Sequence, residues 1–303
     1  MRVVAALGGN ALLERGQLAD AETQRRNVAK AVRSLGALAR EHELIVTHGN
    51  GPQVGLLALQ AEAYHGVRPY PLDVLGAESE GMVGYLLEQG LRAELPEREA
   101  ATLLTQVIVD RDDAAFTSPT KPIGPVYTKV EADVLAETRG WTVAPDGDSW
   151  RRVVASPEPR EIVELHAIRL LVEAGVVVVC VGGGGVPVVE ENGALRGVEA
   201  VIDKDLAAAL LARELQADAL LLLTDVDGIE LEHGTAAARP LDSATPADLR
   251  ALALPAGSMG PKAEAAARFV EAGGRLAAIC SLDAALAALE GKAGTLVREV
   301  THV

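Results

Sequence analysis

Lysine is scarce in this chain, which has only six lysines among its 28 basic residues, the other 22 being arginine. Aromatic residues make up only 3% of its 303 residues, and there are only two cysteines. Cys180 and Cys280 each close an apolar run, so we interpret them as small buried hydrophobic residues rather than redox groups. This use of cysteine fits a reducing cytoplasmic compartment.

Positive net charge and long apolar runs are also missing. The chain has 43 acidic residues and a formal net charge of −15, which disfavours nucleic acid and anionic membrane surfaces as partners because both would repel it. No apolar run approaches the ~18 residues of a membrane span, and the run at 3–7 is too short for a secretory signal. We therefore expect a soluble cytoplasmic protein that captures any anionic substrate at a local site.

The hydrophobic residues, 49% of the chain, must build the core from Ala, Val, Leu and Ile. Short Val/Leu-rich runs alternate with helical patterns, which predicts an α/β fold with a mostly parallel sheet and helices on its faces. The predicted strands are 3–7, 44–47, 102–109, 176–181, 219–224 and 276–280. The predicted helices are 22–40, 52–65, 72–94, 158–172, 203–215 and 259–272. Ser156 followed by Pro157 suits the start of the fourth helix, and Gly175 suits its end.

The segment 112–152 interrupts this alternation. It contains no good sheet strand by its pattern, and three prolines fall within seven residues, at Pro119, Pro122 and Pro125. Thr128 followed by Glu131 predicts a capping box for a short helix that runs through Thr138. We interpret the segment as a compact excursion that carries Lys121, either a lid or a surface insertion.

Three predicted strands lead directly into glycine-rich turns. The turns contain Gly8-Gly9-Asn10, then Gly49-Asn50-Gly51, and then four glycines that begin with Gly182 and Gly183. In a parallel sheet all three turns meet at the carboxyl edge, where such folds bind ligands. Glycine lets backbone N–H groups approach a ligand, and a following helix adds its partial positive end. One such turn is a weak signal, but together they predict an oxyanion site made of backbone.

Half of the lysines lie in three short motifs of this acidic chain. Lys121 is in the proline-rich excursion, Lys204 lies between Asp203 and Asp205, and Lys262 follows Gly-Ser-Met-Gly-Pro. A chain that prefers arginine and keeps lysine here needs compact point charges, and phosphate is the obvious partner. A lysine in the first turn of a helix is also unfavourable to the helix dipole, so Lys204 has another role. Asp225, after the strand 219–224, is either a nucleotide neighbour or ordinary turn chemistry.

Other chemistries find little support in the sequence. It contains neither the Walker pattern G-x-x-x-x-G-K-[ST] nor a G-x-G-x-x-G dinucleotide fingerprint. The six histidines have no metal-ligand spacing with one another or with the cysteines, so no protein metal site is predicted, and there is no G-x-S-x-G elbow. Among the histidines only His48 adjoins a glycine loop, where a structural role is favoured. Phosphoryl transfer needs mainly positioning and charge neutralisation, which these motifs supply.

These motifs resemble those of the carbamate kinases in the amino acid kinase superfamily. The resemblance covers essentially the whole chain and includes the segments 6–10, 47–55, 182–187, 223–227 and 255–262. Two strings are specific to carbamate kinases, namely Pro119-Thr-Lys-Pro-Ile-Gly-Pro125 and Gly197-Val-Glu-Ala-Val-Ile-Asp-Lys-Asp205. Two positions depart from the family pattern, Glu80 where glutamine is common and Glu230 where an aromatic or small residue is common.

The resemblance implies one amino acid kinase domain over 1–303, a three-layer αβα sandwich that forms a homodimer. Residues 1–175 would bind carbamate or carbamoyl phosphate, with a protruding subdomain at 112–152, and residues 176–303 would bind ATP or ADP. The implied reaction is the reversible Mg²⁺-dependent transfer of a phosphoryl group between ATP and carbamate, often used to make ATP in the arginine deiminase pathway.

The resemblance also implies roles for single residues. Lys204 and Lys262 would neutralise the transferring phosphoryl group, Asp205 would hold both lysines, and Lys121 would reach in from the subdomain. The substrate cradle would consist of Gly8, Gly9, Asn10, Gly49, Asn50, Gly51, Gly182 and Gly183. The nucleotide would lie by Asp203, Asp225, Ser258 and Met259. A sister acyl-phosphate or phosphonate kinase and a non-catalytic sensor of nucleotide or acyl phosphate are the alternatives.

Overall fold

A central eight-stranded sheet organises the protein. The computed structural model describes residues 1–14, 16–235, 237–255, 257 and 259–299, and the backbone but not the side chain of Asn10. Six strands of this sheet run parallel, in the order β16-β12-β1-β2-β9-β3, and β17 and β15 extend it beyond β16. The strands are β1 (Arg2–Leu7), β2 (Glu43–His48), β3 (Ala100–Thr102), β9 (Val177–Val179), β12 (Ala219–Thr224), β15 (Ser243–Ala244), β16 (Leu276–Ser281) and β17 (Thr295–Val297).

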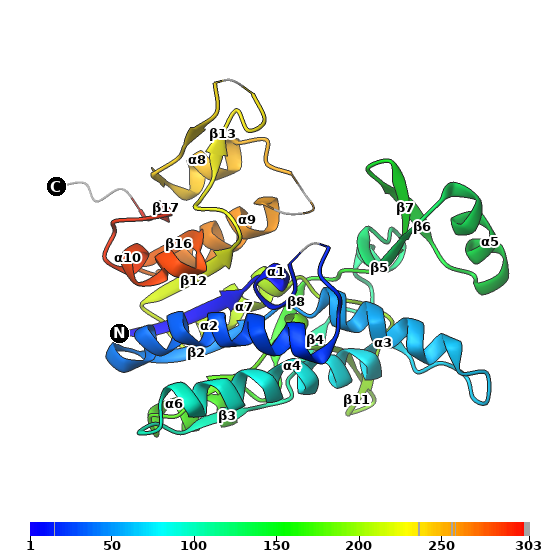
Figure 1. Ribbon diagram of the computed structural model, residues 1–303, viewed down its shortest axis with the longest axis horizontal. Coiled ribbons are helices and arrows are strands. Elements are labelled where there is room, and N and C mark those ends of the chain that lie inside the picture. Colours follow the sequence, from blue (N-terminus) through cyan, green and yellow to red (C-terminus); the bar gives the residue numbers. More distant parts are fainter. Residues whose placement is uncertain (15, 236, 256, 258, 300–303) are drawn as a thin grey trace.

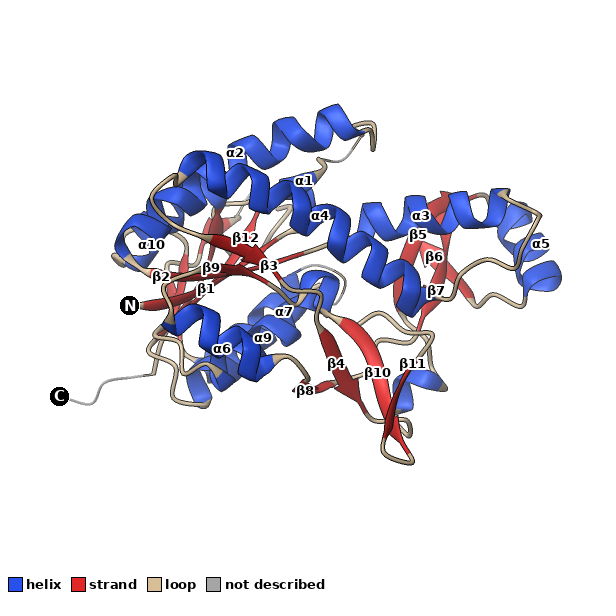
Figure 2. Cartoon of the chain, turned by 90° about the horizontal axis from the view of Figure 1, so that it is seen from below, coloured by secondary structure: helices blue, strands red, loops and turns tan. Residues whose placement is uncertain are grey.

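Helices cover both faces of this sheet, as Figure 2 shows. One face carries α2 (Ala21–Glu41), α4 (Leu72–Glu94) and α10 (Ala285–Leu289), and the other carries α6 (Leu165–Glu173), α7 (Lys204–Glu214) and α9 (Met259–Glu271). In β1, Val4 and Ala6 pack into one core while Val3, Ala5 and Leu7 pack into the other. Because side chains alternate along a strand, a strand buried on both faces must be apolar throughout. The predicted three-layer α/β fold is confirmed.

A second sheet lies beside the first and was not predicted. It has four strands in the order β11-β10-β4-β8. They are β4 (Gln106–Val109), β8 (Pro159–Ile162), β10 (Val186–Glu191) and β11 (Ala194–Gly197).

Two sequence predictions are wrong at this second sheet. The predicted strand 102–109 is two strands, because β3 pairs with β9 in the central sheet and β4 pairs with β10 and β8 in the second sheet. The helix predicted at 158–172 begins only at Leu165, because Pro159–Ile162 pairs with β4 as β8. The Ser156-Pro157 signal is therefore not a helix start, whereas Gly175 follows the end of α6 with a φ of +83°.

The segment after Lys121 forms an appendage that projects from the body of the molecule (Figure 1). Its three-stranded antiparallel sheet has the order β5-β7-β6, with β5 (Lys121–Tyr127), β6 (Val143–Asp146) and β7 (Ser149–Val154). The prediction that this segment lacks strands is wrong. Pro122 and Pro125 lie in β5 and Pro145 lies in β6. Both are edge strands, where a missing N–H is tolerated. The predicted capping box of Thr128 and Glu131 is confirmed at the start of α5 (Lys129–Arg139).

Short elements complete the fold. Near the carboxyl edge of the central sheet lie α1 (Gly9–Leu12) and α3 (Gly51–Ala63), and the C-terminal half adds the hairpin β13 (Glu230–Leu231) and β14 (Arg239–Pro240) and the helix α8 (Pro246–Ala251). Across the described ranges, no helix is both long enough and apolar enough to cross a lipid bilayer.

Candidate active site

The three glycine turns lie at one edge of the central sheet, as predicted. They follow β1, β2 and β9, which are adjacent and parallel. The first two turns touch, because a Cβ on Gly49 would lie 2.9 Å from Gly9 N. The first turn also meets β12, since Gly8 N donates to Leu223 O at 2.9 Å. Only glycine permits these approaches, so the backbones of the turns lie close together.

Helices begin at the first two turns. Asn50 is the N-cap of α3, and Pro52 occupies the first turn of this helix, as its position in the sequence predicts. The backbone of Asn10 lies in α1, which starts at Gly9; the side chain of Asn10 is outside the described part of the chain. The start of α3 therefore points its free N–H groups and its partial positive charge at the edge of the sheet.

The third turn, residues 181–185, has an unusual backbone. Val181 has a φ of +53°, and Gly183, Gly184 and Gly185 have φ values of +66°, +97° and +82°. A β-branched residue in the left-handed region is strained, and such strain is found most often at functional sites. The turn also packs on the second one, because a Cβ on Gly183 would lie 2.1 Å from Asn50 Nδ2.

Two lysines share one buried carboxylate beside these turns. Lys204 Nζ lies 2.5 Å from Asp205 Oδ1, and Lys262 Nζ lies 3.1 Å from Asp205 Oδ2. The three side chains are 14%, 12% and 5% exposed for Lys204, Lys262 and Asp205. Lys204 and Asp205 begin α7, and Lys262 comes from the second turn of α9, so the packing of two helices brings the charges together. The trio has a net charge of +1.

Burial and mutual attraction set the protonation of the trio. Burial alone would raise the pKa of Asp205, but the charges of Lys204 and Lys262 outweigh it and hold this pKa below its ordinary value. Burial lowers the pKa of Lys204, and Asp205 opposes that shift. The stem of Lys204 passes over the second turn, since a Cβ on Gly49 would lie 3.3 Å from Lys204 Cδ. The positive charge is thus held against the backbone cradle.

Asp203 joins the trio to the appendage. Its Oδ1 accepts hydrogen bonds from Asp205 N at 2.9 Å and Leu206 N at 3.3 Å, which makes it the N-cap of α7. Its Oδ2 accepts a hydrogen bond from Lys121 Nζ at 2.6 Å. A backbone contact runs alongside, because Val201 N donates to Ala155 O at 2.9 Å, just after β7. The position of the appendage is therefore coupled to the start of α7.

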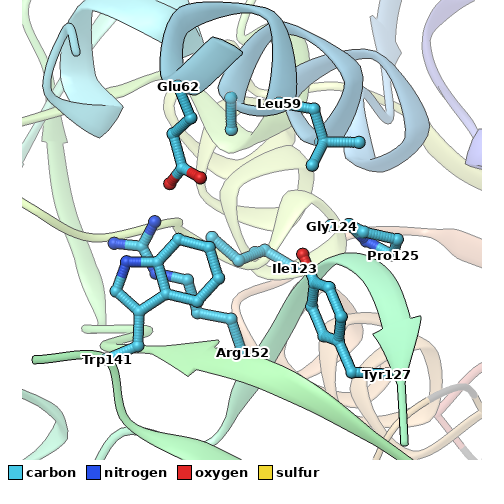
Figure 3. Close-up of a pocket in the computed structure, with 10 residues that line it drawn as sticks. Leu59, Glu62, Ile123, Gly124, Pro125, Tyr127, Trp141 and Arg152 are labelled. Atoms are coloured by element: carbon cyan, nitrogen blue, oxygen red, sulfur yellow. The ribbon is translucent and has the colours of Figure 1, made fainter. Parts of the chain in front are cut away.

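The appendage also packs on α3, around a small pocket that Figure 3 shows. Trp141 is the centre of this contact: Arg152 lies over its ring at 4.7 Å from the centroid, and the ring of Tyr127 lies 6.4 Å away. Arg139 pairs with Glu62 of α3. The pocket is lined by Gly55, Ala58, Leu59, Glu62, Ile123, Gly124, Pro125, Tyr127, Trp141 and Arg152. These contacts hold Lys121 near the sheet edge.

The predicted nucleotide residues are placed less tightly. Asp225 is exposed after β12, next to the first glycine turn, and its Oδ1 accepts a hydrogen bond from Thr224 Oγ1 at 3.2 Å. Met259 begins α9, one turn before Lys262, and packs against the core. Ser258 lies outside the described residues. Within the described ranges, no group of three or more His, Cys, Asp or Glu side chains could hold a metal ion.

Sequence reasoning missed three side chains that contact the glycine turns: Ser79, Glu80 and Thr105. Asn50 Nδ2 donates to Ser79 Oγ at 2.7 Å, and Gly182 N donates to Glu80 Oε1 at 2.8 Å. Only the departure of Glu80 from the family pattern marked any of them in the sequence.

His48, predicted to be structural, is fully buried, with Nδ1 3.1 Å from Gly49 O. Burial lowers the pKa of His48 to about 4, so its imidazole is neutral.

Comparison with known proteins agrees with this geometry. The family model for the amino acid kinase family matches residues 1–281. A carbamate kinase of Rhizobium meliloti is 52% identical over 301 residues, 98% of this chain and 93% of that protein. The structure of a Giardia lamblia carbamate kinase bound to AMP-PNP has a TM-score of 0.90 and 42% identity, over 98% of both chains. The same enzyme thiocarbamoylated by disulfiram on a cysteine has a TM-score of 0.87 and 41% identity, again over 98% of both chains. The chain therefore belongs to the amino acid kinase family and, within it, to the carbamate kinases.

Proposed function

We propose that this chain catalyses reversible phosphoryl transfer between ATP and carbamate, giving ADP and carbamoyl phosphate. The observation that carries the proposal is the buried trio of Lys204, Asp205 and Lys262 beside the meeting point of three glycine turns. The chain's 52% identity with a carbamate kinase selects this acceptor within the family.

In the direction that makes ATP, a terminal phosphate oxygen of ADP attacks the phosphorus of carbamoyl phosphate. The new P–O bond forms as the bond between phosphorus and the carbamate oxygen breaks, and carbamate leaves as an anion. Negative charge is spread over the three equatorial oxygens of the phosphoryl group during this step, so catalysis depends on positioning and neutralisation. Lys204 and Lys262 supply the neutralising charge, and Asp205 keeps the two ammonium groups from separating.

The glycine turns hold the substrates on the two sides of the transferring group. Gly8, Gly9, Asn10, Gly49, Asn50 and Gly51 cradle the phosphoryl and carbamate ends, and Gly182 and Gly183 close the third side. Apart from Gly182 and Gly183, we assign the phosphoryl and carbamate end of the substrate to residues 1–175, and the nucleotide to residues 176–303. Within the second of these ranges, we assign contact with the nucleotide to Asp203, Asp225, Ser258 and Met259. AMP-PNP in the Giardia lamblia relative supports nucleotide binding.

Lys121 completes the site from the appendage at 112–152. Its ion pair with Asp203 sets the ammonium group at the start of α7. From there it reaches the leaving carbamate oxygen when the appendage closes on substrate. Closure also excludes water, which would otherwise hydrolyse the acyl phosphate.

Magnesium fits this site as an ion carried by the nucleotide. Asp205 and Asp203 already receive lysines, and within the described ranges no cluster of three ligands exists. Mg²⁺ is commonly bound by substrate phosphates, waters and one or two carboxylates, and Asp225 lies at this edge, directly after β12. When bound, the ion would neutralise charge on the nucleotide phosphates.

We further propose that the protein is a cytoplasmic homodimer that makes ATP during arginine breakdown.

The test is ATP formation from ADP, Mg²⁺ and carbamoyl phosphate, with acetyl phosphate as a parallel donor. Lys262→Ala should abolish ATP formation, and Lys292→Ala, which removes an exposed lysine, should not. The Lys262 variant should lose kcat far more than substrate binding. Absence of ATP with the folded wild type would overturn the proposal, and faster reaction with acetyl phosphate would instead indicate a sister acyl-phosphate kinase.

A further inference from the structure

Two adjacent residues of α4 contact two different glycine turns. Ser79 and Glu80 are 0% and 1% exposed, in the middle of a helix that covers the central sheet. Ser79 Oγ accepts a hydrogen bond from Asn50 Nδ2 at 2.7 Å and donates to Gly76 O at 2.8 Å. The hydroxyl hydrogen is thereby used within α4, which leaves the oxygen free to accept from Asn50. Ser79 therefore fixes both the position and the rotamer of the Asn50 side chain.

Glu80 holds the third turn by its backbone. Its Oε1 accepts a hydrogen bond from Gly182 N at 2.8 Å, and its Oε2 accepts one from Thr105 N at 3.2 Å. Thr105 Oγ1 in turn accepts from Val181 N at 3.0 Å. Two consecutive N–H groups of the turn, on Val181 and Gly182, thus have side-chain acceptors that the rest of the fold supplies.

These bonds are needed because the turn is strained. Val181 has a φ of +53°, and a β-branched residue in this region is strained at a cost in free energy. The surrounding structure must overcome that cost for the turn to persist. The side-chain oxygens that accept hydrogen bonds from the N–H groups of residues 181 and 182 offset this cost. Releasing the turn would leave a buried carboxyl without its donors.

The two contacts act on one unit, because the second and third turns interlock. A Cβ on Gly183 would lie 2.1 Å from Asn50 Nδ2, and a Cβ on Gly182 would lie 2.4 Å from His48 Nε2. Asn50 is therefore packed between Ser79 and Gly183, and any displacement of the third turn displaces it.

We propose that Ser79 and Glu80 are positioning residues of the phosphoryl-transfer site, which set the second and third glycine turns at the spacing that the substrate requires. This inference rests on the proposed function. It assigns to α4, which contributes no predicted catalytic group, the task of keeping the cradle in its reactive shape.

The charge state of Glu80 gives this role a distinctive signature. Cys180, directly after β9, and Glu164, before α6, interact with it. His48 of β2 lies with Glu80 around the Cβ position of Gly182, and His48 is neutral because burial lowers its pKa. Burial raises the pKa of Glu80 to about 8, and the charge of Glu164 adds to that effect. Glu80 is therefore a neutral acid at pH 7. When it ionises, a negative charge appears directly behind the cradle for an anionic substrate.

The experiment measures kcat, KM and the pH profile of ATP formation for the wild type, Ser79→Ala, Glu80→Leu and Glu80→Gln. Glu78→Gln is the matched control, since Glu78 is an exposed carboxylate on the same helix. Ser79→Ala and Glu80→Leu should lower kcat by about 10- to 100-fold, with the KM for ADP nearly unchanged, because misplacement of the cradle affects the reacting geometry. Glu80→Gln keeps one acceptor oxygen for Gly182 N and should lose less than about tenfold.

The pH profile separates positioning from mere structural support. The wild type and Glu78→Gln should lose activity as the pH rises through about 8, and Glu80→Gln should not, because an amide does not ionise. If Glu80→Gln loses activity at alkaline pH as the wild type does, the loss is due to Lys204, and the role of Glu80 is overturned. If Glu80→Leu fails to fold, Ser79→Ala and Glu80→Gln carry the test.

The remaining outcomes are also decisive. If the wild type is active and both Ser79→Ala and Glu80→Gln have the same kcat as the wild type at every pH, this inference is overturned. The proposed function is then unaffected. A folded wild type that forms no ATP overturns the proposed function, and the inference falls with it.

Discussion

Lys262 and Asp205 are 57 residues apart in the sequence, yet Lys262 Nζ lies 3.1 Å from Asp205 Oδ2 in the interior. The neighbouring Lys204 occupies the other oxygen of the same carboxylate. One buried acid thus holds together two ammonium groups that would otherwise repel each other at short range. This relationship makes the start of α7 and the second turn of α9 a single electrostatic unit.

The role of Asp205 predicts the effect of its removal. Asp205→Asn keeps the shape of the side chain but deprives two buried ammonium groups of their counterion, so kcat should fall by about 100-fold or more. The pKa of Lys204, already lowered by burial, should fall further. Activity would then be lost at a lower pH than in the wild type, which steady-state rates between pH 6 and 9 would reveal.

Asp133→Asn is the matched control for this substitution. Asp133 pairs with Lys129 at 2.5 Å on the exposed surface of α5, where an ion pair contributes little. Wild-type rates in Asp205→Asn would contradict the assignment of the trio.

Lys121 should matter for activity more than for stability. Its side chain is 32% exposed and bridges the appendage to Asp203, and solvent screening limits such a pair to less than ~1 kcal/mol of stability. Lys121→Ala should therefore leave the melting temperature nearly unchanged and lower kcat by about tenfold or more, as expected for a lost contact to the leaving carbamate oxygen. Lys129→Ala, in the same appendage, should change neither quantity. A large loss of stability without loss of activity would refute this account.

Gly183 tests the interlocking of the second and third turns. An alanine there must place its Cβ against Asn50 Nδ2, at 2.1 Å, with a φ of +66°. Gly183→Ala should displace Asn50 and abolish activity. Gly193→Ala is the comparison, because Gly193 has a φ of +77° but nothing lies within 4 Å of its Cβ position. It should cost only about 1 kcal/mol of backbone strain; equal kinetic effects of the two variants would exclude a specific clash.

Glu80 predicts how stability varies with pH. The native state keeps a proton on Glu80 up to about pH 8, whereas the unfolded chain releases it near the ordinary glutamate pKa of 4.5. The folded state therefore binds more protons in this window, and stability must fall as the pH rises from about 4.5 to 8. Urea unfolding at pH 5.5 and 7.5 should show a steeper loss in the wild type than in Glu80→Gln, with Glu78→Gln like the wild type. Parallel losses would show that Glu80 is ionised in the native protein.

The two cysteines predict resistance to thiol reagents. Cys180 and Cys280 are 1% and 0% exposed. Burial raises the pKa of both thiols, that of Cys280 to about 12, so neither offers an accessible thiolate. Disulfiram, which thiocarbamoylates a cysteine of the Giardia lamblia relative, should therefore leave the activity of this chain unchanged. A colorimetric thiol reagent should detect neither cysteine in the native protein and both after unfolding; rapid labelling of the folded protein would contradict this prediction.

Much of the fold could be predicted because its signals are local. β1, β2 and β12 are apolar runs that must be buried on both faces. The capping box of Thr128 and Glu131 depends on a pattern only four residues long. The errors occur where local patterns are ambiguous. The run 102–109 is rich in Val, Ile, Leu and Thr, which favour strands, and nothing local shows that residues 103–105 leave one sheet for another. Proline often occupies the first turn of a helix, but Pro157 precedes the strand β8.

Residue types and their short spacings set the chemistry of this protein: an apolar α/β core, glycine turns after parallel strands, and lysines at positions in an acidic chain where phosphate must be bound. Those features depend on residue type and short spacing. Packing between distant segments set which residues share the site, because it brings Asp205 to Lys262, and Ser79 and Glu80 to turns 29 and 102 residues away. Burial also decided the charge of Glu80, since desolvation in the packed core, not the residue type, sets the pKa of a carboxyl.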